Sequence, residues 1–179
     1  KMILNSKIIG SQKKVLIILH GLFGSLDNWY SVAKELALNY QVHILDQRNH
    51  GKSFHNKNHS YDFMSDDLYN YINYHKLKEP TILGHSMGGK TAMVFAFHYP
   101  QYLNKMIIID IGPKSYINDY NMLISTLIEI NNAQLNSRKK AQLILENKSI
   151  DNKTIHFLLK NLFWKEDKLK FRFNINAIE

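Results

Sequence analysis

One serine stands between two glycines at the point where a short apolar run is followed by a longer apolar segment. Residues 84–88 read Gly-His-Ser-Met-Gly, after the run 81–83 and before the segment 90–97. The run is typical of a buried strand and the segment of a buried helix. A serine on such a tight strand-to-helix turn is lifted above the sheet, beside the free N–H groups of the helix. The pattern predicts Ser86 as a nucleophile for acyl transfer rather than an ordinary turn serine.

A second glycine-containing loop follows a continuous apolar run at residues 15–19. Residues 20–24 read His-Gly-Leu-Phe-Gly. The tetrahedral intermediate of acyl transfer carries an oxyanion, which needs two backbone N–H donors: one after the nucleophile and one from a loop of this kind. We predict the Met87 and Leu22 N–H groups as these donors, with the Phe23 N–H as the neighbouring choice for the second. The alternative is a plain glycine loop that closes the strand.

Asp110 is the candidate acid, at the carboxyl end of a predicted strand over residues 106–109. Adjacent strands lie about 4.8 Å apart, so this carboxylate can reach a histidine beside Ser86. Two alternatives stay open: an aspartate that only caps the following turn, and an acid from a later strand. His85 flanks the nucleophile, and on so tight a turn we expect it to point away from Ser86.

Residues 46–53 read Asp-Gln-Arg-Asn-His-Gly-Lys-Ser and follow another predicted strand. Asp46, Arg48 and His50 resemble catalytic groups, but the better interpretation is that they brace the loops around the site. No histidine pair has metal-ligand spacing, and the sequence predicts neither a metal site nor a cofactor. We expect surface positions for His55, His59, His75 and His98, and a partly wet helix face for His156.

The composition excludes several classes of function. The 179 residues include no cysteine, which rules out disulfides, thiolate zinc sites and a cysteine nucleophile. The formal charge is +8, but the basic residues are scattered, so a nucleic-acid-binding face is not expected; a weak attraction to acidic partners stays open. No apolar run is long enough to span a membrane, and the N-terminus lacks the apolar stretch of a signal peptide. We therefore expect a cytoplasmic protein.

The first half of the chain alternates strands and helices. This order predicts an α/β fold with a mostly parallel sheet and helices on both of its faces. The predicted helix 60–72 begins at a capping serine, and Pro100 ends the helix that follows Ser86. The predicted strands are 15–19, 42–45, 81–83 and 106–109, with a possible antiparallel edge at 3–9; the predicted helices are 29–37, 60–72 and 87–99.

The pattern changes after Gly112-Pro113. Amphipathic periodicity predicts helices over about 120–128, 137–144 and 151–162, and alternation at Phe171, Phe173 and Ile175 predicts a strand after a turn at 165–167. A block of helices after a parallel sheet is typical of a lid over the strand ends, where ligands bind. We divide the chain into an α/β core, residues 1–113, and a helical lid or cap, residues 114–179.

Four segments carry a resemblance to a known family: residues 20–29, 46–53, 84–90 and 109–113, with 157–161 and 172–174 in the lid. They closely resemble the YbfF-type esterases of the α/β-hydrolase superfamily. The resemblance implies an α/β-hydrolase fold and a serine hydrolase that cleaves small-molecule carboxylic esters or thioesters through an acyl-enzyme. It also implies Ser86 as nucleophile and Asp110 as acid.

The sequence departs from this family at its end. The family continues past the lid with two more strands and a Gly-His-Trp segment that carries the catalytic histidine, whereas this chain stops at Glu179 and begins with Lys1. We therefore expect the last strands and the base to be missing, the strand 106–109 to present a bare apolar edge, and the chain alone to be inactive or very weak.

Other functions share part of this pattern. A non-catalytic relic or a module that binds an acyl ligand is the main alternative to a hydrolase. Carbon–carbon hydrolases and cofactor-free perhydrolases use the same triad and stay open, whereas a dehalogenase would need an aspartate in place of Ser86. The sequence does not indicate acyl length, leaving group or oligomeric state.

Overall fold

The computed structural model describes residues 2–116 and 120–178. The chain divides into two compact units, Lys1–Lys114 and Ser115–Glu179. The first unit holds every residue predicted to take part in chemistry.

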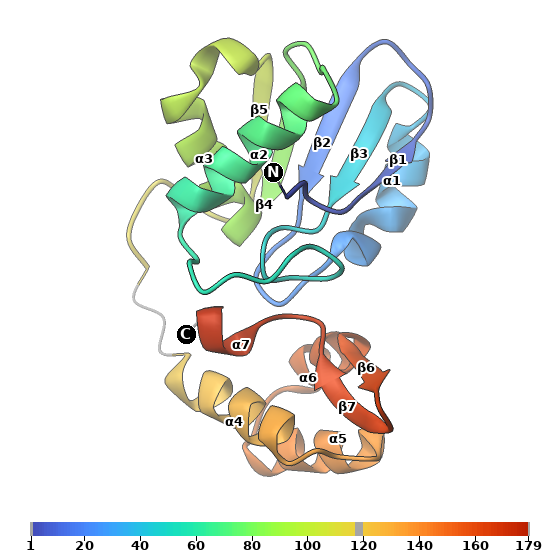
Figure 1. Ribbon diagram of the computed structural model, residues 1–179, viewed down its shortest axis with the longest axis vertical. Coiled ribbons are helices and arrows are strands. Elements are labelled where there is room, and N and C mark those ends of the chain that lie inside the picture. The colour runs from blue at the N-terminus through green and yellow to red at the C-terminus, as the bar shows by residue number, and fades with distance from the viewer. Residues whose placement is uncertain (1, 117–119, 179) are drawn as a thin grey trace. The chain divides into compact units, whose positions relative to one another are not determined.

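The first unit is built on a five-stranded sheet in the order β1-β3-β2-β4-β5 (Figure 1). Strands β2 to β5 run parallel, and β1 pairs antiparallel with β3 at one edge. This confirms the predicted parallel sheet and its antiparallel edge strand. The strands are β1 Ser6–Ile9, β2 Val15–Leu19, β3 Gln41–Leu45, β4 Thr81–His85 and β5 Lys105–Ile109.

The register of the sheet brings the predicted loops together. Leu19 of β2 pairs with Leu45 of β3 and with Gly84 of β4, and His85 of β4 pairs with Ile109 of β5. The carboxyl ends of these four strands therefore lie at one edge. The loops that carry residues 20–24, 46–53, 86 and 110 all begin there.

Helices cover both faces of the sheet because its central strands are apolar on both sides. Leu16 and Ile18 of β2 pack on the side of α1, whereas Ile17 and Leu19 pack on the side of α2 and α3. These side chains are at most 2% exposed. The helices of this unit are η1 Leu26–Trp29, α1 Tyr30–Leu36, α2 Tyr61–Tyr74, α3 Met87–His98 and η2 Pro100–Tyr102.

The helix boundaries follow the expected local signals. The Ser60 hydroxyl accepts from the Phe63 N–H and caps α2. Helix α3 ends at His98, two residues before Pro100, which begins η2. The predicted helix 29–37 corresponds to α1, Tyr30–Leu36, which directly follows the 3-10 turn η1.

Strand β5 forms the other edge of the sheet and is largely uncovered. Met106, Ile107 and Ile109 are 39%, 44% and 36% exposed. This confirms the predicted apolar edge, and it distinguishes β5 from the fully covered strands β2 and β4.

The second unit has its own small core. Helix α4 packs against α5, α7 and β7, and α5 packs against α6. The Asp151 carboxylate accepts from the Thr154 N–H at 3.0 Å and caps α6, as predicted, whereas the Ser137 side chain makes no cap hydrogen bond to α5. The elements are α4 Asn121–Asn132, α5 Arg138–Asn147, α6 Asn152–Lys160, the hairpin β6 Leu162–Lys165 and β7 Lys168–Phe171, and α7 Ile175–Ile178.

Two predictions for the second unit were wrong. The third helix does not reach Leu162, which opens strand β6, and the strand predicted over 171–175 lies at Lys168–Phe171 instead. Glu166 and Asp167 both have positive φ, 48° and 61°, so the turn is tight enough to pair the residues on either side of it. Ile175 shares the alternation of Phe171 but begins a helical turn, α7.

Within the described parts of the chain, no helix combines the length and the apolarity that crossing a membrane would need.

Candidate active site

Ser86 has a strained backbone between β4 and α3. Its φ of 50° and ψ of −115° lie in a region that residues with a Cβ rarely adopt. The Ser86 N–H donates to the Ile109 carbonyl at 3.0 Å, and the Ser86 carbonyl accepts from the Lys90 N–H at 3.1 Å. One bond to the sheet and one to the helix therefore fix the turn, and the half-buried Ser86 stands at the carboxyl edge of the strands.

The two glycines that flank Ser86 are required by contact distance. A Cβ at Gly84 would lie 2.3 Å from the Gly88 carbonyl oxygen, and a Cβ at Gly88 would lie 2.4 Å from the Leu19 carbonyl oxygen. Both obstacles are backbone atoms, so neither can move aside cheaply. The sharp turn predicted from the Gly-His-Ser-Met-Gly pattern is present in the structure.

The loop 20–24 passes beside Ser86. A Cβ built on Gly21 would lie 3.4 Å from the Ser86 Cβ. The Phe23 N–H donates to His50 Nε2 at 3.2 Å, which occupies one of the two amides considered for the oxyanion. The Leu22 N–H has no recorded acceptor among the described residues, and Met87 opens α3, where backbone N–H groups lack intrahelical acceptors. Leu22 and Met87 remain the predicted donors.

Asp110 follows Ile109, whose carbonyl holds the Ser86 amide. Its φ is 55°, and its side chain is 87% exposed. Its carboxylate lies near the His85 side chain, with 4.0 Å between Asp110 Oδ2 and His85 Nε2. The His85 ring also faces Trp29, with 6.1 Å between ring centroids. The acid role of Asp110 stays a prediction, and its position at the strand end beside the serine turn is consistent with that role.

Two histidines are buried at the loop 20–24, His20 as its first residue and His50 beside it, and both are held neutral. His20 Nδ1 donates to the Gly21 carbonyl at 2.8 Å, and its Nε2 accepts from the Gln47 N–H at 3.0 Å. His50 Nδ1 donates to the Arg48 carbonyl at 2.9 Å. Burial lowers the pKa of His20, and it lowers the pKa of His50 well below 6.5, with His20 adding to the effect. Neither ring is placed to take a proton from Ser86.

Asp46 ties three segments together, as the bracing interpretation predicted. Its carboxylate accepts from the Leu26 N–H at 2.8 Å, from Asn5 Nδ2 at 2.7 Å and from the Lys52 N–H at 2.9 Å. A Cβ at Gly51 would lie 2.1 Å from the Asp46 Cγ, so the loop 46–53 closes tightly around this carboxylate. Asp46 therefore fixes the loop on β3 against the loop on β2.

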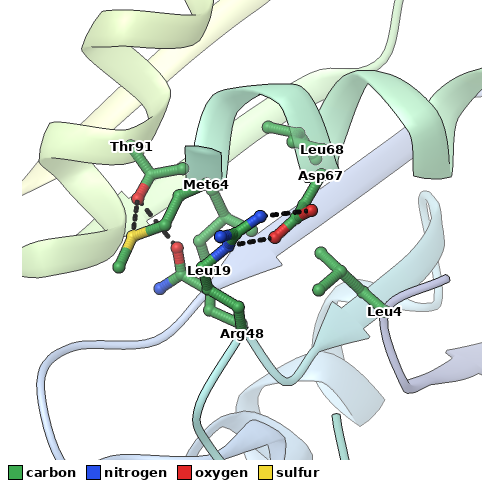
Figure 2. A pocket seen from close by; sticks show the side chains of 8 residues that line it. Leu4, Leu19, Arg48, Met64, Asp67, Leu68 and Thr91 are labelled. Carbon is green, nitrogen blue, oxygen red and sulfur yellow. Dashed lines mark hydrogen bonds and ion pairs between the residues drawn. The ribbon is translucent and has the colours of Figure 1, made fainter. Parts of the chain in front are cut away.

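Arg48 also braces the loop, because its side chain is paired with α2. Its guanidinium donates two hydrogen bonds to Asp67 of α2, at 2.6 and 2.8 Å (Figure 2). Both side chains are less than 10% exposed. Burial raises the pKa of Asp67, and the Arg48 charge opposes that shift. Both residues also line a small pocket, together with Leu4, Leu19, Gln47, Met64, Leu68 and Thr91.

The other histidines lie away from the serine or on the surface. His43 of β3 is buried against the Tyr71 hydroxyl, 2.8 Å from its Nδ1, and burial lowers the pKa of His43 to about 4. His59 was expected on the surface but is half-buried, and burial lowers its pKa to about 4; its ring lies 5.9 Å from that of His50 because residues 49–59 fold back. His75 was also expected on the surface but is half-buried against His43 and Tyr71, whereas His55, His98 and His156 are exposed.

No histidine of the first unit is hydrogen-bonded to the proposed nucleophile. The sequence has nine histidines, all among the residues that the structure describes, and His156 alone belongs to the second unit. No hydrogen bond of the Ser86 hydroxyl to any described residue is recorded. The first unit therefore holds the predicted nucleophile and the predicted amide donors, and none of its histidines is hydrogen-bonded to the serine.

The fold and this serine turn define an α/β hydrolase. A family model for the alpha/beta hydrolase fold matches residues 14–158, and the chain belongs to that family. A putative esterase/lipase of Haemophilus influenzae is 36% identical over 165 residues, 92% of this chain and 57% of that protein. Esterase YbfF of Escherichia coli is 30% identical over 164 residues, 91% of this chain and 63% of that protein. The predicted resemblance is confirmed.

A solved structure shows the same arrangement. A marine microorganism esterase superposes with a TM-score of 0.93 and 40% sequence identity, over 99% of this chain and 71% of that chain. The chain spans 57% of the length of the Haemophilus influenzae protein and 63% of the length of the Escherichia coli protein, and it matches both along nearly all of its own length.

Proposed function

We propose that this protein is a serine hydrolase that cleaves carboxylic ester or thioester bonds through an acyl-enzyme. The observation that carries the proposal is the Ser86 backbone, held at positive φ between two glycines at the start of α3. Such strain persists only where the surrounding structure enforces it, and it concentrates at functional sites. The esterase names of the relatives support hydrolase chemistry at the level of the family.

The reaction follows from the proposed roles. Ser86 Oγ attacks the acyl carbon while a base takes its proton, and the carbonyl oxygen becomes an oxyanion between the Leu22 and Met87 N–H groups. The C–O or C–S bond to the leaving group then breaks, and the alcohol or thiol departs with the proton. Water repeats the sequence on the acyl-enzyme and releases the acid. Asp110 would orient the base. These steps require no metal or cofactor.

The proposed reaction needs a base, and no described histidine of the first unit is hydrogen-bonded to Ser86. Since none of the first unit's histidines is bonded to Ser86, we propose that the base is a histidine supplied by the complete gene product outside these 179 residues. Without a triad base, the remaining amide donors and substrate binding still support a residual rate, while kcat falls by about four to six orders of magnitude.

A cytoplasmic location and a lid role for residues 114–179 remain predictions.

Ester turnover tests the proposal. The protein made from the complete reading frame should hydrolyse p-nitrophenyl butyrate or a short acyl thioester, and Ser86→Ala should abolish that activity. Ser125→Ala is the matched control, because Ser125 is an exposed helical serine in α4. Equal activity of the Ser86→Ala variant and the unsubstituted protein would refute the role of Ser86.

A non-catalytic acyl-binding module is the second candidate. It is favoured by one observation, that the Ser86 hydroxyl has no base in contact. This function predicts that the complete gene product binds a fatty acid or acyl ester without turning it over. Turnover that depends on Ser86 would exclude it.

A further inference from the structure

His50 connects the loop 46–53 to the loop 20–24 by a hydrogen bond that crosses from one strand end to the next. Its Nε2 accepts from the Phe23 N–H at 3.2 Å, and its Nδ1 donates to the Arg48 carbonyl at 2.9 Å. The side chain is fully buried. His50 therefore contacts the backbone of the loop that lies beside Ser86, without contacting Ser86 itself.

The two partners of His50 dictate its tautomer. A carbonyl oxygen can only accept, so Nδ1 carries the proton; a backbone N–H can only donate, so Nε2 has none. His20 is held in the same tautomer by a carbonyl and an amide, and the two ring centroids are 5.1 Å apart. A protonated His50 would lose the Phe23 bond, so the connection exists only with a neutral ring.

This bond distinguishes the two amides that the sequence leaves open for the oxyanion. The Phe23 N–H is directed to His50, and Phe23 has a φ of 58°, which a residue with a side chain rarely adopts without such support. The Gly24 N–H donates back to the Gly21 carbonyl at 3.0 Å. Of the three amides after Gly21, only that of Leu22 has no acceptor recorded within the described parts of the chain.

We infer that His50 is a positioning residue for the oxyanion site: by engaging the Phe23 N–H, it fixes the loop with the Leu22 N–H as the donor beside Ser86. The inference rests on the proposed hydrolase function, and it goes further by assigning the loop amide and the residue that selects it. His50 acts through the backbone and touches neither the substrate nor the nucleophile.

Two substitutions separate the two hydrogen bonds of His50. The Gln amide group reaches the position of Nε2, so His50→Gln keeps an acceptor for Phe23; the Asn amide group reaches the position of Nδ1, so His50→Asn keeps only the donor to Arg48. Each variant loses one buried hydrogen bond, and we expect similar losses of thermal stability. A merely structural role would therefore lower the activity of both variants alike.

Steady-state hydrolysis of p-nitrophenyl butyrate by the complete gene product provides the first readout. Loss of one oxyanion donor lowers kcat about 100- to 1000-fold, and a misplaced one should lower it at least about 10-fold, with KM nearly unchanged. We expect this loss in His50→Asn and recovery of most of it in His50→Gln. His43→Asn is the control: His43 is buried and hydrogen-bonded in β3, so its loss should lower stability and not kcat. Equal losses of kcat in both His50 variants would overturn the inference.

Amide hydrogen exchange provides a readout that needs no activity. The Phe23 amide should be protected in the unsubstituted protein and in His50→Gln, and it should exchange at least about 10-fold faster in His50→Asn. Equal protection in all three proteins would overturn the inference even if the protein hydrolyses esters. An inactive protein that shows the expected exchange pattern would refute the hydrolase proposal and leave the His50 bond established, so the two failures are distinguishable.

Discussion

Replacement of Ser86 by glycine should give a more stable protein than replacement by alanine, and both substitutions remove the proposed nucleophile. The φ of 50° and ψ of −115° at Ser86 cost about 1–3 kcal/mol for a residue with a Cβ, and glycine adopts them freely. Glycine also loses about 0.5–1 kcal/mol more backbone entropy on folding than alanine does. The difference predicts that Ser86→Gly is about 1–2 kcal/mol more stable than Ser86→Ala, which keeps both the Cβ and the strain.

Urea unfolding and thermal melts of the two variants measure this difference. For a chain of this length, 1 kcal/mol corresponds to about 2–4 °C in Tm. The control is Ala96→Gly within α3, where the backbone is helical and glycine should instead destabilise by about 1 kcal/mol. If Ser86→Gly is less stable than Ser86→Ala by a similar amount, then the serine turn is unstrained and the reasoning fails.

Three further outcomes follow from the packing around the site. Gly88→Ala, whose Cβ would lie 2.4 Å from the Leu19 carbonyl oxygen, should cost about 3 kcal/mol or more in urea unfolding. Removing Arg48 or Asp67 alone should cost about 3–5 kcal/mol, whereas Arg48→Met combined with Asp67→Leu should recover most of it; additive losses in a double-mutant cycle would contradict the pairing. Burial lowers the pKa of His43, His50 and His59 in the folded state, so these histidines bind protons on unfolding below pH 6.5. The free energy of unfolding should therefore fall as the pH drops from 6.5 towards 4, by up to about 1.4 kcal/mol per pH unit for each histidine. His43→Gln should flatten that slope.

The sheet and the serine turn were predictable because their signals are local. Strands covered on both faces need continuous apolar runs such as residues 15–19, and a sharp turn needs glycines at fixed spacing around Ser86. The second unit was harder to predict. Leu162 continues the helical periodicity of α6, and its placement in β6 depends on a turn at residues 166–167 that pairs it with Phe171.

The loops of the site were predictable in position, but their hydrogen bonds were not. Which amide of residues 22–23 is engaged depends on His50, which lies 27 residues from Phe23 in the sequence. Arg48 and Asp67 lie 19 positions apart in the sequence, so the loop sequence 46–53 predicted a bracing role for Arg48 but not its partner.

Labelling with a fluorophosphonate probe tests the central claim most directly. The complete gene product should take up one phosphonyl group, which intact-mass measurement detects and peptide mapping places on Ser86, and Ser86→Ala should take up none. An adduct on another residue, or a folded protein that resists the probe and hydrolyses no p-nitrophenyl ester, would contradict the assignment of Ser86 as the nucleophile.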